Sequence, residues 1–314
     1  MLRSVIAGTG GYLPARVLTN DQLAEAYNLD TSDAWISERT GIRRRHMAAP
    51  GESTADMAAA ACREALAQAG ADASEVDAII LATATPDSAF PSTATRVQEK
   101  LGIHRGFSFD ISAACTGFIY AVGVADSMLR SGACRCALVI GAEAFTRILD
   151  WTDRGTCVLF GDGAGAVLLR AEDEPGERGI LSTHLHSDGR HGDILQVEGG
   201  MVRMAGREVF RHAVSKLASA VDEALAANSL AKADVQWLVP HQANLRIIDA
   251  MGRKLGLPAE RVVVTVDRHA NTSAASIPLA LAEAVRDGRI RQGDLVLMEA
   301  IGGGLTWGAA LARF

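Results

Sequence analysis

A pattern of strand, tight turn and small-residue helix occurs twice in this chain, and similar segments follow each copy in the same order. The matching pairs are 110–115 with 266–271, 137–144 with 295–300, and 163–170 with 307–314. A duplicated βα unit of this kind predicts an α/β protein in which two similar halves stack their sheets. Positions 115 and 271 are then equivalent and face each other.

The duplication also predicts where the chain divides. We expect an N-terminal half of residues 1–170 and a C-terminal half of residues 171–314, with the segment 171–190 crossing between them. The 314 residues are 48% hydrophobic, enough to bury a large core. No linker-like stretch rich in Pro, Gly and Ser separates the halves, so we expect one compact body.

Cys115 lies in the first copy of the pattern, between a predicted buried strand and a predicted helix. Free N–H groups and the positive dipole end at a helix N-terminus favour a thiolate and can hold a developing oxyanion. A single cysteine in an apolar helix is more often a packing residue. The other four fit that interpretation better: Cys62, Cys134, Cys136 and Cys157. We predict Cys115 as a nucleophile, and no metal site because no cysteine pair has suitable spacing.

Two further polar residues end short β-branched or apolar segments. His241 follows the segment 235–240, and Asn271 follows the segment 262–266 and a turn. Taken singly, a strand-end His is usually structural and a turn Asn usually caps a helix. Three such positions in one chain are hard to explain as separate accidents, since functional groups collect at the carboxyl ends of strands in α/β sheets. We therefore assign Cys115, His241 and Asn271 to one site.

Longer motifs surround these residues in a fixed order. They are residues 31–36, 39–43, 89–92, 113–115, 153–155, 160–165, 240–244, 271–276 and 302–304. On these motifs the chain resembles the β-ketoacyl-acyl carrier protein synthase III family of the thiolase-like superfamily, from Gly8 to Phe314. The resemblance implies a thiolase-like fold with a layered α-β-α-β-α core.

The resemblance also implies the reaction and the roles of the triad. An acyl-CoA primer condenses with malonyl-acyl carrier protein in a decarboxylative Claisen reaction, which gives 3-oxoacyl-acyl carrier protein, CoA and CO2 and initiates fatty-acid synthesis. Cys115 carries the acyl group, and the N–H groups of Cys115 and Gly303 form the oxyanion hole. His241 and Asn271 donate hydrogen bonds to the malonyl thioester oxygen as CO2 leaves. No cofactor is expected.

Substrate-binding residues follow from the same resemblance. Trp35, Arg39 and Arg154 are expected at the adenine end of CoA, with Asn244 along the pantetheine arm. The expected acyl pocket consists of Phe90, Phe145, Phe160, Leu195 and Met204. Phe90 is expected to reach the partner subunit's pocket in a homodimer. The aromatic residues favour acetyl or another short primer, and longer or branched primers remain alternatives.

The acidic carrier protein must approach a chain whose formal net charge is −6. A local basic patch is therefore expected, and Arg246, Arg253 and Lys254 lie on the predicted helix after His241. Arg211 is predicted to lie next to them.

Two positions depart from the family pattern. Ala270 stands where the family usually has Gly, and the segment 192–204 is several residues shorter than in enteric members. Alanine disfavours a positive φ. We therefore expect either a backbone at Ala270 that suits alanine or a slightly displaced Asn271.

Other functions fit the sequence less well than a condensing enzyme. A related acyltransferase needs no decarboxylation site, and a polyketide-starter synthase would share the triad. A papain-like protease also uses Cys, His and Asn but lacks these flanking motifs. A scaffold without activity would be expected to have lost a triad residue. Without a run of eighteen apolar residues, a basic arm or a disulfide framework, we expect a cytoplasmic protein that binds neither membrane nor nucleic acid.

Overall fold

The computed structural model describes residues 2–173 and 176–314. Its first sheet has five strands in the order β1 (Leu2–Tyr12), β7 (Asp162–Asp173), β6 (Cys136–Ala144), β4 (Ala78–Ala82) and β5 (Phe107–Ile111). Strand β4 runs parallel to both β5 and β6, whereas β7 is antiparallel to β1 and β6. The edge at which β4, β5 and β6 end is thus available to the loops that follow them.

The second sheet has four strands in the order β11 (Trp237–Pro240), β12 (Leu295–Gly302), β13 (Thr306–Arg313) and β8 (Gly179–Ser187). Strands β11 and β12 are parallel, and β13 is antiparallel to both β12 and β8. The first sheet therefore uses residues up to Asp173, and the second uses residues from Gly179 onward. Strand β7 continues three residues past the predicted boundary at 170, and the division into domains stays a prediction.

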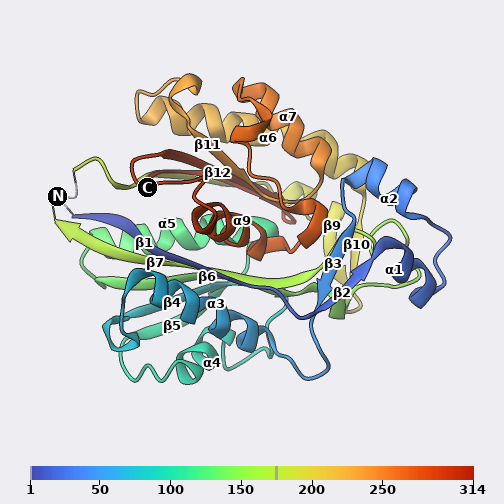
Figure 1. Cartoon of the computed structure of the whole chain (residues 1–314), viewed down its shortest axis with the longest axis horizontal. Coiled ribbons are helices and arrows are strands. Elements are labelled where there is room, and N and C mark those ends of the chain that lie inside the picture. Colours follow the sequence, from blue (N-terminus) through green and yellow to red (C-terminus); the bar gives the residue numbers. More distant parts are fainter. Residues whose placement is uncertain (1, 174–175) are drawn as a thin grey trace.

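Two helices lie between the sheets, α5 (Gly117–Arg130) and α9 (Ser276–Arg286) (Figure 1). They share one apolar cluster with strands of both sheets. Helices α3 (Thr54–Ala69) and α4 (Thr93–Lys100) cover the outer face of the first sheet, and α6 (Gly206–Ala227) and α7 (Leu245–Leu255) cover that of the second. The layered α-β-α-β-α core is confirmed.

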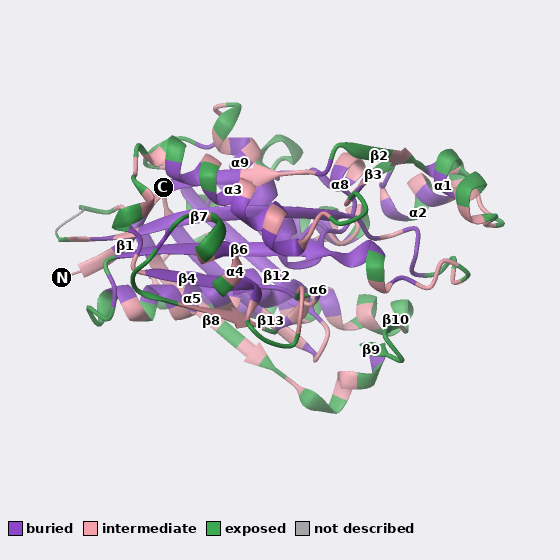
Figure 2. Ribbon diagram, turned by 90° about the horizontal axis from the view of Figure 1, so that it is seen from below, coloured by how far each residue is buried: buried purple, intermediate pink, exposed green. Residues whose placement is uncertain are grey.

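Small residues allow this close stacking of layers. A Cβ at Gly10 of β1 would lie 2.2 Å from the carbonyl oxygen of Ala61 in α3, so only glycine fits there. Buried residues fill the central strands, and exposed ones lie on the periphery (Figure 2). Helix and sheet therefore pack backbone against backbone, with few large side chains between them.

The remaining elements gather at the end of the molecule opposite the two termini (Figure 1). They are β2 (Arg16–Thr19), β3 (Arg44–Met47), β9 (Leu195–Glu198), β10 (Met201–Met204), α1 (Asn20–Tyr27), α2 (Asp33–Thr40) and the short α8 (Val266–His269). Strand β2 pairs with β3, and β9 pairs with β10. Among the described residues, we find no helix with the length and apolarity that a membrane span requires.

Candidate active site

Cys115 lies in a short turn of 3-10 helix (Ala114–Thr116) between β5 and α5. The turn begins at Ala114, whose φ is +45°. A glycine turn from the C-terminal half approaches closely, because a Cβ at Gly302 would lie 2.6 Å from the Cys115 nitrogen. The Thr116 hydroxyl donates to the carbonyl oxygen of Thr306 over 2.9 Å. The two halves therefore hold the thiol jointly.

His241 follows the last residue of β11, and its backbone N–H donates to the carbonyl oxygen of Glu299 in β12 over 2.8 Å. Its ring nitrogen Nδ1 lies 2.6 Å from the hydroxyl oxygen of Ser276, the first residue of α9. Burial lowers the pKa of the imidazole to about 3, so the ring is neutral near pH 7.

Asn271 is fixed by both its backbone and its side chain. Its N–H donates to Leu159 over 2.9 Å, and its carbonyl oxygen accepts from Gly161 over 3.1 Å. The side-chain Oδ1 accepts the N–H of Ser273 over 2.8 Å. Because Oδ1 is engaged in this way, the amide NH2 is the group that remains to donate into the site.

The backbone conformation at Ala270 contradicts the first of the two expectations for that position, a backbone that suits alanine. Ala270 has a φ of +58° and a ψ of −162°, a region that strongly favours glycine. The backbone is therefore not one that suits alanine. Asn271 nevertheless lines the same cavity as Cys115 and His241.

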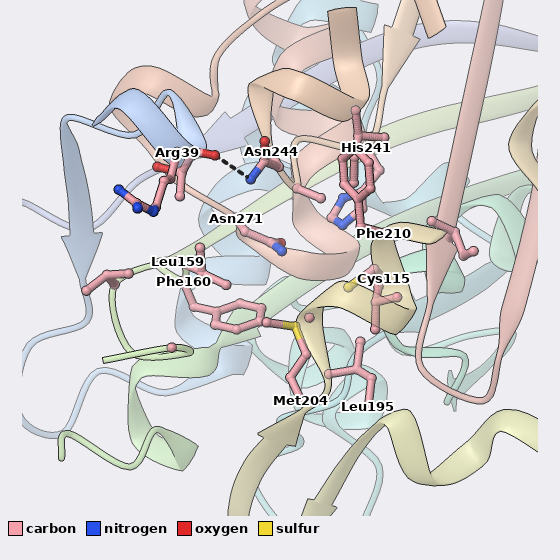
Figure 3. Close-up of a pocket in the computed structure, with 18 of the residues that line it drawn as sticks. Arg39, Cys115, Leu159, Phe160, Leu195, Met204, Phe210, His241, Asn244 and Asn271 are labelled. Atoms are coloured by element: carbon pink, nitrogen blue, oxygen red, sulfur yellow. Dashed lines mark hydrogen bonds between the residues drawn. The ribbon is translucent and has the colours of Figure 1, made fainter. Parts of the chain in front are cut away.

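The three predicted residues meet in one cavity of about 260 Å³ (Figure 3). Cys115 also lines a second cavity, together with Gly303 and Phe145. The sulfur-bearing residue thus lies where two cavities meet. A molecule entering through the first cavity reaches Cys115 beside His241 and Asn271, and a group attached to the sulfur has the second cavity available.

The protonation state of Cys115 differs from the sequence-based expectation. Burial raises the pKa of this thiol to about 12, and the nearby carboxyl of Glu143 adds to the effect. The free protein therefore holds this thiol protonated near pH 7, in contrast to the thiolate that a helix N-terminus favours, because burial removes the solvation that a thiolate needs. Glu143 is itself fully buried, and burial raises its pKa to about 7 although Thr85 and the Ala84 N–H hydrogen-bond it.

Of the four residues predicted to bind CoA, Trp35, Arg39 and Asn244 line the other end of the first cavity, and Arg154 lies over the ring of Trp35. The guanidinium carbons of Arg39 and Arg154 lie 4.5 and 4.8 Å from the ring centre of Trp35. Asn244 caps α7 through its Oδ1, and its NH2 donates to the Arg39 carbonyl oxygen over 3.1 Å (Figure 3). An aromatic face flanked by two guanidinium groups suits a planar base that carries phosphate.

The predicted acyl-pocket residues separate into three groups. Phe145 and Phe160 stack with ring centres 4.3 Å apart, and with Leu195 they line the second cavity, whereas Phe160 and Leu195 also line the first. Met204 lines the first cavity instead. Phe90 is 85% exposed and lies in neither lining. In the single chain, the side chain of Phe90 is therefore exposed and can contact the surface of another subunit.

The predicted basic patch is exposed and lies on neighbouring helices. Arg246, Arg253 and Lys254 belong to α7, and Arg211 belongs to α6, which packs against α7. Arg246 also donates to the carbonyl oxygen of Glu38 in α2 over 3.2 Å.

Within residues 2–173 and 176–314, no group of three or more His, Cys, Asp and Glu side chains is arranged to hold a metal ion.

The sequence did not indicate several residues at this site. Phe210, Val209 and Ile301 line the first cavity, and Ser276 contacts His241. Ser276 belongs to a motif that carried the family resemblance, but nothing in its spacing indicated a hydroxyl aimed at a histidine 35 positions earlier in the chain. Such long-range contacts depend on the stacking of the two halves.

Comparison with known families and proteins agrees with this geometry. Residues 109–189 match the family model "3-Oxoacyl-[acyl-carrier-protein (ACP)] synthase III", and residues 225–314 match the model of its C-terminal part. A β-ketoacyl-[acyl-carrier-protein] synthase III of Acidiphilium cryptum is 66% identical, and the match covers 100% of both chains. The chain belongs to the β-ketoacyl-acyl carrier protein synthase III family.

Other synthase III proteins support the same assignment. The Rhodospirillum centenum protein of that name is 64% identical, over 100% of this chain and 99% of its own. The crystal structure of 3-oxoacyl-[acyl-carrier-protein] synthase III from Aquifex aeolicus VF5 superposes with a TM-score of 0.95 at 48% identity, covering 99% of this chain and 100% of that one. The thiolase-like fold of the synthase III family is thereby confirmed.

Proposed function

We propose that this protein condenses a short acyl-CoA, acetyl-CoA in the simplest case, with malonyl-acyl carrier protein and so begins fatty-acid synthesis. The observation that supports this best is the meeting of Cys115, His241 and Asn271 in one cavity whose far end is lined by Trp35 and Arg39. One nucleophile and two N–H donors are what a two-step condensation needs. A plain acyltransferase would need no pair of donors beside the thiol.

In the first step, the Cys115 sulfur attacks the thioester carbonyl of the acyl-CoA. The N–H groups of Cys115 and Gly303 stabilise the oxyanion. When the intermediate collapses, the bond from carbon to the CoA sulfur breaks and the acyl group stays on Cys115. The proton of the Cys115 thiol ends on the departing CoA sulfur, which balances the step without a permanent thiolate.

In the second step, malonyl-acyl carrier protein occupies the cavity that CoA has left. Loss of CO2 leaves an enolate, whose oxygen accepts hydrogen bonds from His241 and Asn271. The enolate carbon attacks the acyl carbonyl, the bond from carbon to the Cys115 sulfur breaks, and the released thiolate takes up a proton from solvent. The products are 3-oxoacyl-acyl carrier protein and CO2.

Binding residues are proposed on the same basis. Trp35, Arg39, Arg154 and Asn244 hold CoA, and Phe145, Phe160, Leu195 and Met204 surround the acyl group. Arg211, Arg246, Arg253 and Lys254 attract the acidic carrier protein. No cofactor takes part, because both steps are completed by the thiol and the hydrogen-bond donors.

A homodimer and a cytoplasmic location complete the proposal. Phe90 and Val197, which are 85% and 51% exposed, are apolar side chains that a second subunit would cover.

All five cysteines are free thiols, which suits a reducing compartment. The two halves, 1–170 and 171–314, are proposed to act as one body in each subunit.

The test is to capture the intermediate. After incubation with acetyl-CoA, peptide mapping by mass spectrometry should place one acetyl group on Cys115, and added malonyl-acyl carrier protein should convert it to acetoacetyl-acyl carrier protein. Cys115→Ser should abolish the label and Cys157→Ser should retain it. Acetylation of Cys62 or Cys157 instead would contradict the assignment of the nucleophile.

A further inference from the structure

The hydrogen bond between Ser276 and His241, at 2.6 Å between Oγ and Nδ1, is shorter than the 2.8 Å bond that Asn271 Oδ1 accepts. Both residues are buried, with 2% and 5% of their surfaces exposed. Ser276 begins α9, the central helix that follows the loop of Asn271. A single hydroxyl thus connects the loop that carries His241 to the helix that follows Asn271.

The direction of this hydrogen bond follows from a second contact. The backbone N–H of Gln242 lies 3.3 Å from the same hydroxyl oxygen. A backbone N–H can only donate, so Ser276 accepts that bond, and its own proton needs an acceptor. Nδ1 of His241 is the acceptor that lies within reach. The reverse direction, from Nδ1–H to the oxygen, would leave the hydroxyl proton unsatisfied in a buried place, which is destabilising.

The side chain of Gln242 holds the backbone segments around His241 in place. Its side-chain NH2 donates to the carbonyl oxygens of Pro240 and Val263 over 2.8 and 3.0 Å. Its Oε1 accepts the N–H groups of Thr265 and Val266 over 2.8 and 3.0 Å. All four hydrogen-bonding positions of this buried amide are used. The end of β11 and the segment that leads to Asn271 are therefore tied together, and the imidazole has little freedom to turn.

We infer that Ser276 is a positioning residue that fixes His241 in the tautomer with its proton on Nε2. A neutral imidazole carries one ring proton, and with Nδ1 occupied as an acceptor that proton lies on Nε2. Nε2–H and the NH2 of Asn271 then form a matched pair of donors, each oriented by a serine: the Ser276 hydroxyl for His241 and the Ser273 N–H for Asn271.

This inference rests on the proposed function and adds a restriction to it. An imidazole protonated at Nε2 donates to the enolate oxygen but cannot accept the Cys115 proton through that nitrogen. His241 is therefore a hydrogen-bond donor in the second step and no base in the first. The assignment agrees with the proton balance given above, in which the thiol proton leaves with CoA.

The first experiment measures the tautomer in the wild-type protein. The protein is labelled with 15N-histidine, and the ring nitrogens are assigned by NMR with His241→Gln as the reference that removes one spin system. Between about pH 6 and pH 8, Nδ1 of His241 should show the shift of an unprotonated nitrogen and Nε2 that of a protonated one. A proton on Nδ1 would overturn the inference, whether or not the protein condenses acyl groups.

The second experiment separates positioning from folding. Ser276→Ala should lower kcat for condensation by roughly tenfold or more, change the ring-nitrogen shifts of His241, and leave the rate of Cys115 acetylation within about twofold. Ser276→Thr, which keeps the hydroxyl, should retain the wild-type shifts and most of the activity. Ser127→Ala is the matched control, because that helical serine bonds only within α5.

The outcomes distinguish a failure of the proposed function from a failure of the assignment of Ser276. If wild-type protein has the predicted tautomer but does not condense acetyl-CoA with malonyl-acyl carrier protein, the proposed function fails and the assignment of Ser276 stands. If Ser276→Ala leaves the His241 shifts and condensation unchanged, the inference is wrong. Equal loss of acetylation and condensation would also overturn it, since Ser276 would then only support the fold.

Discussion

The N–H of Ser273 points at Asn271 Oδ1 from 2.8 Å and thereby turns the amide NH2 of Asn271 toward the cavity that it shares with Cys115. An amide held in this way donates at any pH and takes up no proton. Its contribution should therefore appear where negative charge develops on oxygen.

Replacing Asn271 should separate the two half-reactions. Asn271→Ala removes the donor, so condensation should fall by roughly a hundredfold or more while acetylation of Cys115 continues. Asn271→Asp keeps the shape but offers only acceptors, and it should be at least as impaired. Stopped-flow acetylation and a coupled condensation assay give the two rates. Normal condensation by either variant would remove Asn271 from the mechanism.

Ala270 stores strain that glycine would release. Its φ of +58° disfavours any residue with a Cβ. Ala270→Gly should therefore raise the free energy of unfolding by about 1 kcal/mol, after the added flexibility of the unfolded chain is subtracted. Urea denaturation followed by circular dichroism measures this difference. A less stable Gly variant would mean that packing of the buried methyl group outweighs the strain.

Glu299 should make stability fall as pH rises. Burial raises the pKa of this carboxyl to about 8, so the native state keeps a proton that the unfolded chain releases above its ordinary pKa of 4.5. Between these values wild type should lose about 1.4 kcal/mol per pH unit relative to Glu299→Gln, which has nothing to ionise. Urea titrations at several pH values give the difference. A difference that does not change with pH would show that Glu299 ionises normally.

The basic patch should act on the carrier protein alone. Arg246→Glu should raise the apparent KM for malonyl-acyl carrier protein and flatten its dependence on salt, because exposed charges act mainly on association. Arg63→Glu makes the same charge change on α3, at the opposite outer layer, and should leave this KM unchanged. An equal loss of acetylation in Arg246→Glu would contradict docking, and would fit its contact with α2.

Phe90 should be needed for assembly. Sedimentation of the wild type should give a mass near twice 33.0 kDa, and Phe90→Arg, which places a charge on the proposed interface, should shift the protein toward the monomer and lower its activity. A fully active monomer would refute the idea that a partner completes the site.

Local pattern in the sequence predicted two similar halves with stacked sheets and the meeting of Cys115, His241 and Asn271, and the family resemblance implied the layered fold. Cys115 and His241 follow strands β5 and β11. Asn271 follows the short helix α8, because residues 262–265 form only an isolated bridge at Val262 before that helix begins. The same reasoning failed where burial depends on distant segments. The run Arg43-Arg44-Arg45 reads as a solvated charge cluster, yet Arg45 is fully buried and bonds Asn20 over 2.7 Å and the Val158 carbonyl oxygen over 3.0 Å.

The protonation state of Cys115 differs from expectation for a related reason, whereas its role as nucleophile stays a prediction. Its position at a helix start was visible in the sequence, whereas the depth of burial and the neighbouring Glu143 were not. Ser276 was equally hidden, because only the packing of α9 against the end of β11 brings its hydroxyl to His241.

The position of Cys115 at the junction of two cavities sets an order of events. Both thioester arms are proposed to reach the sulfur through the cavity that begins at Trp35, and two arms cannot occupy it together. CoA must therefore leave before the carrier protein's arm arrives. Initial-rate plots at several fixed concentrations of one substrate should give parallel lines, and free CoA should compete with malonyl-acyl carrier protein for the acylated form.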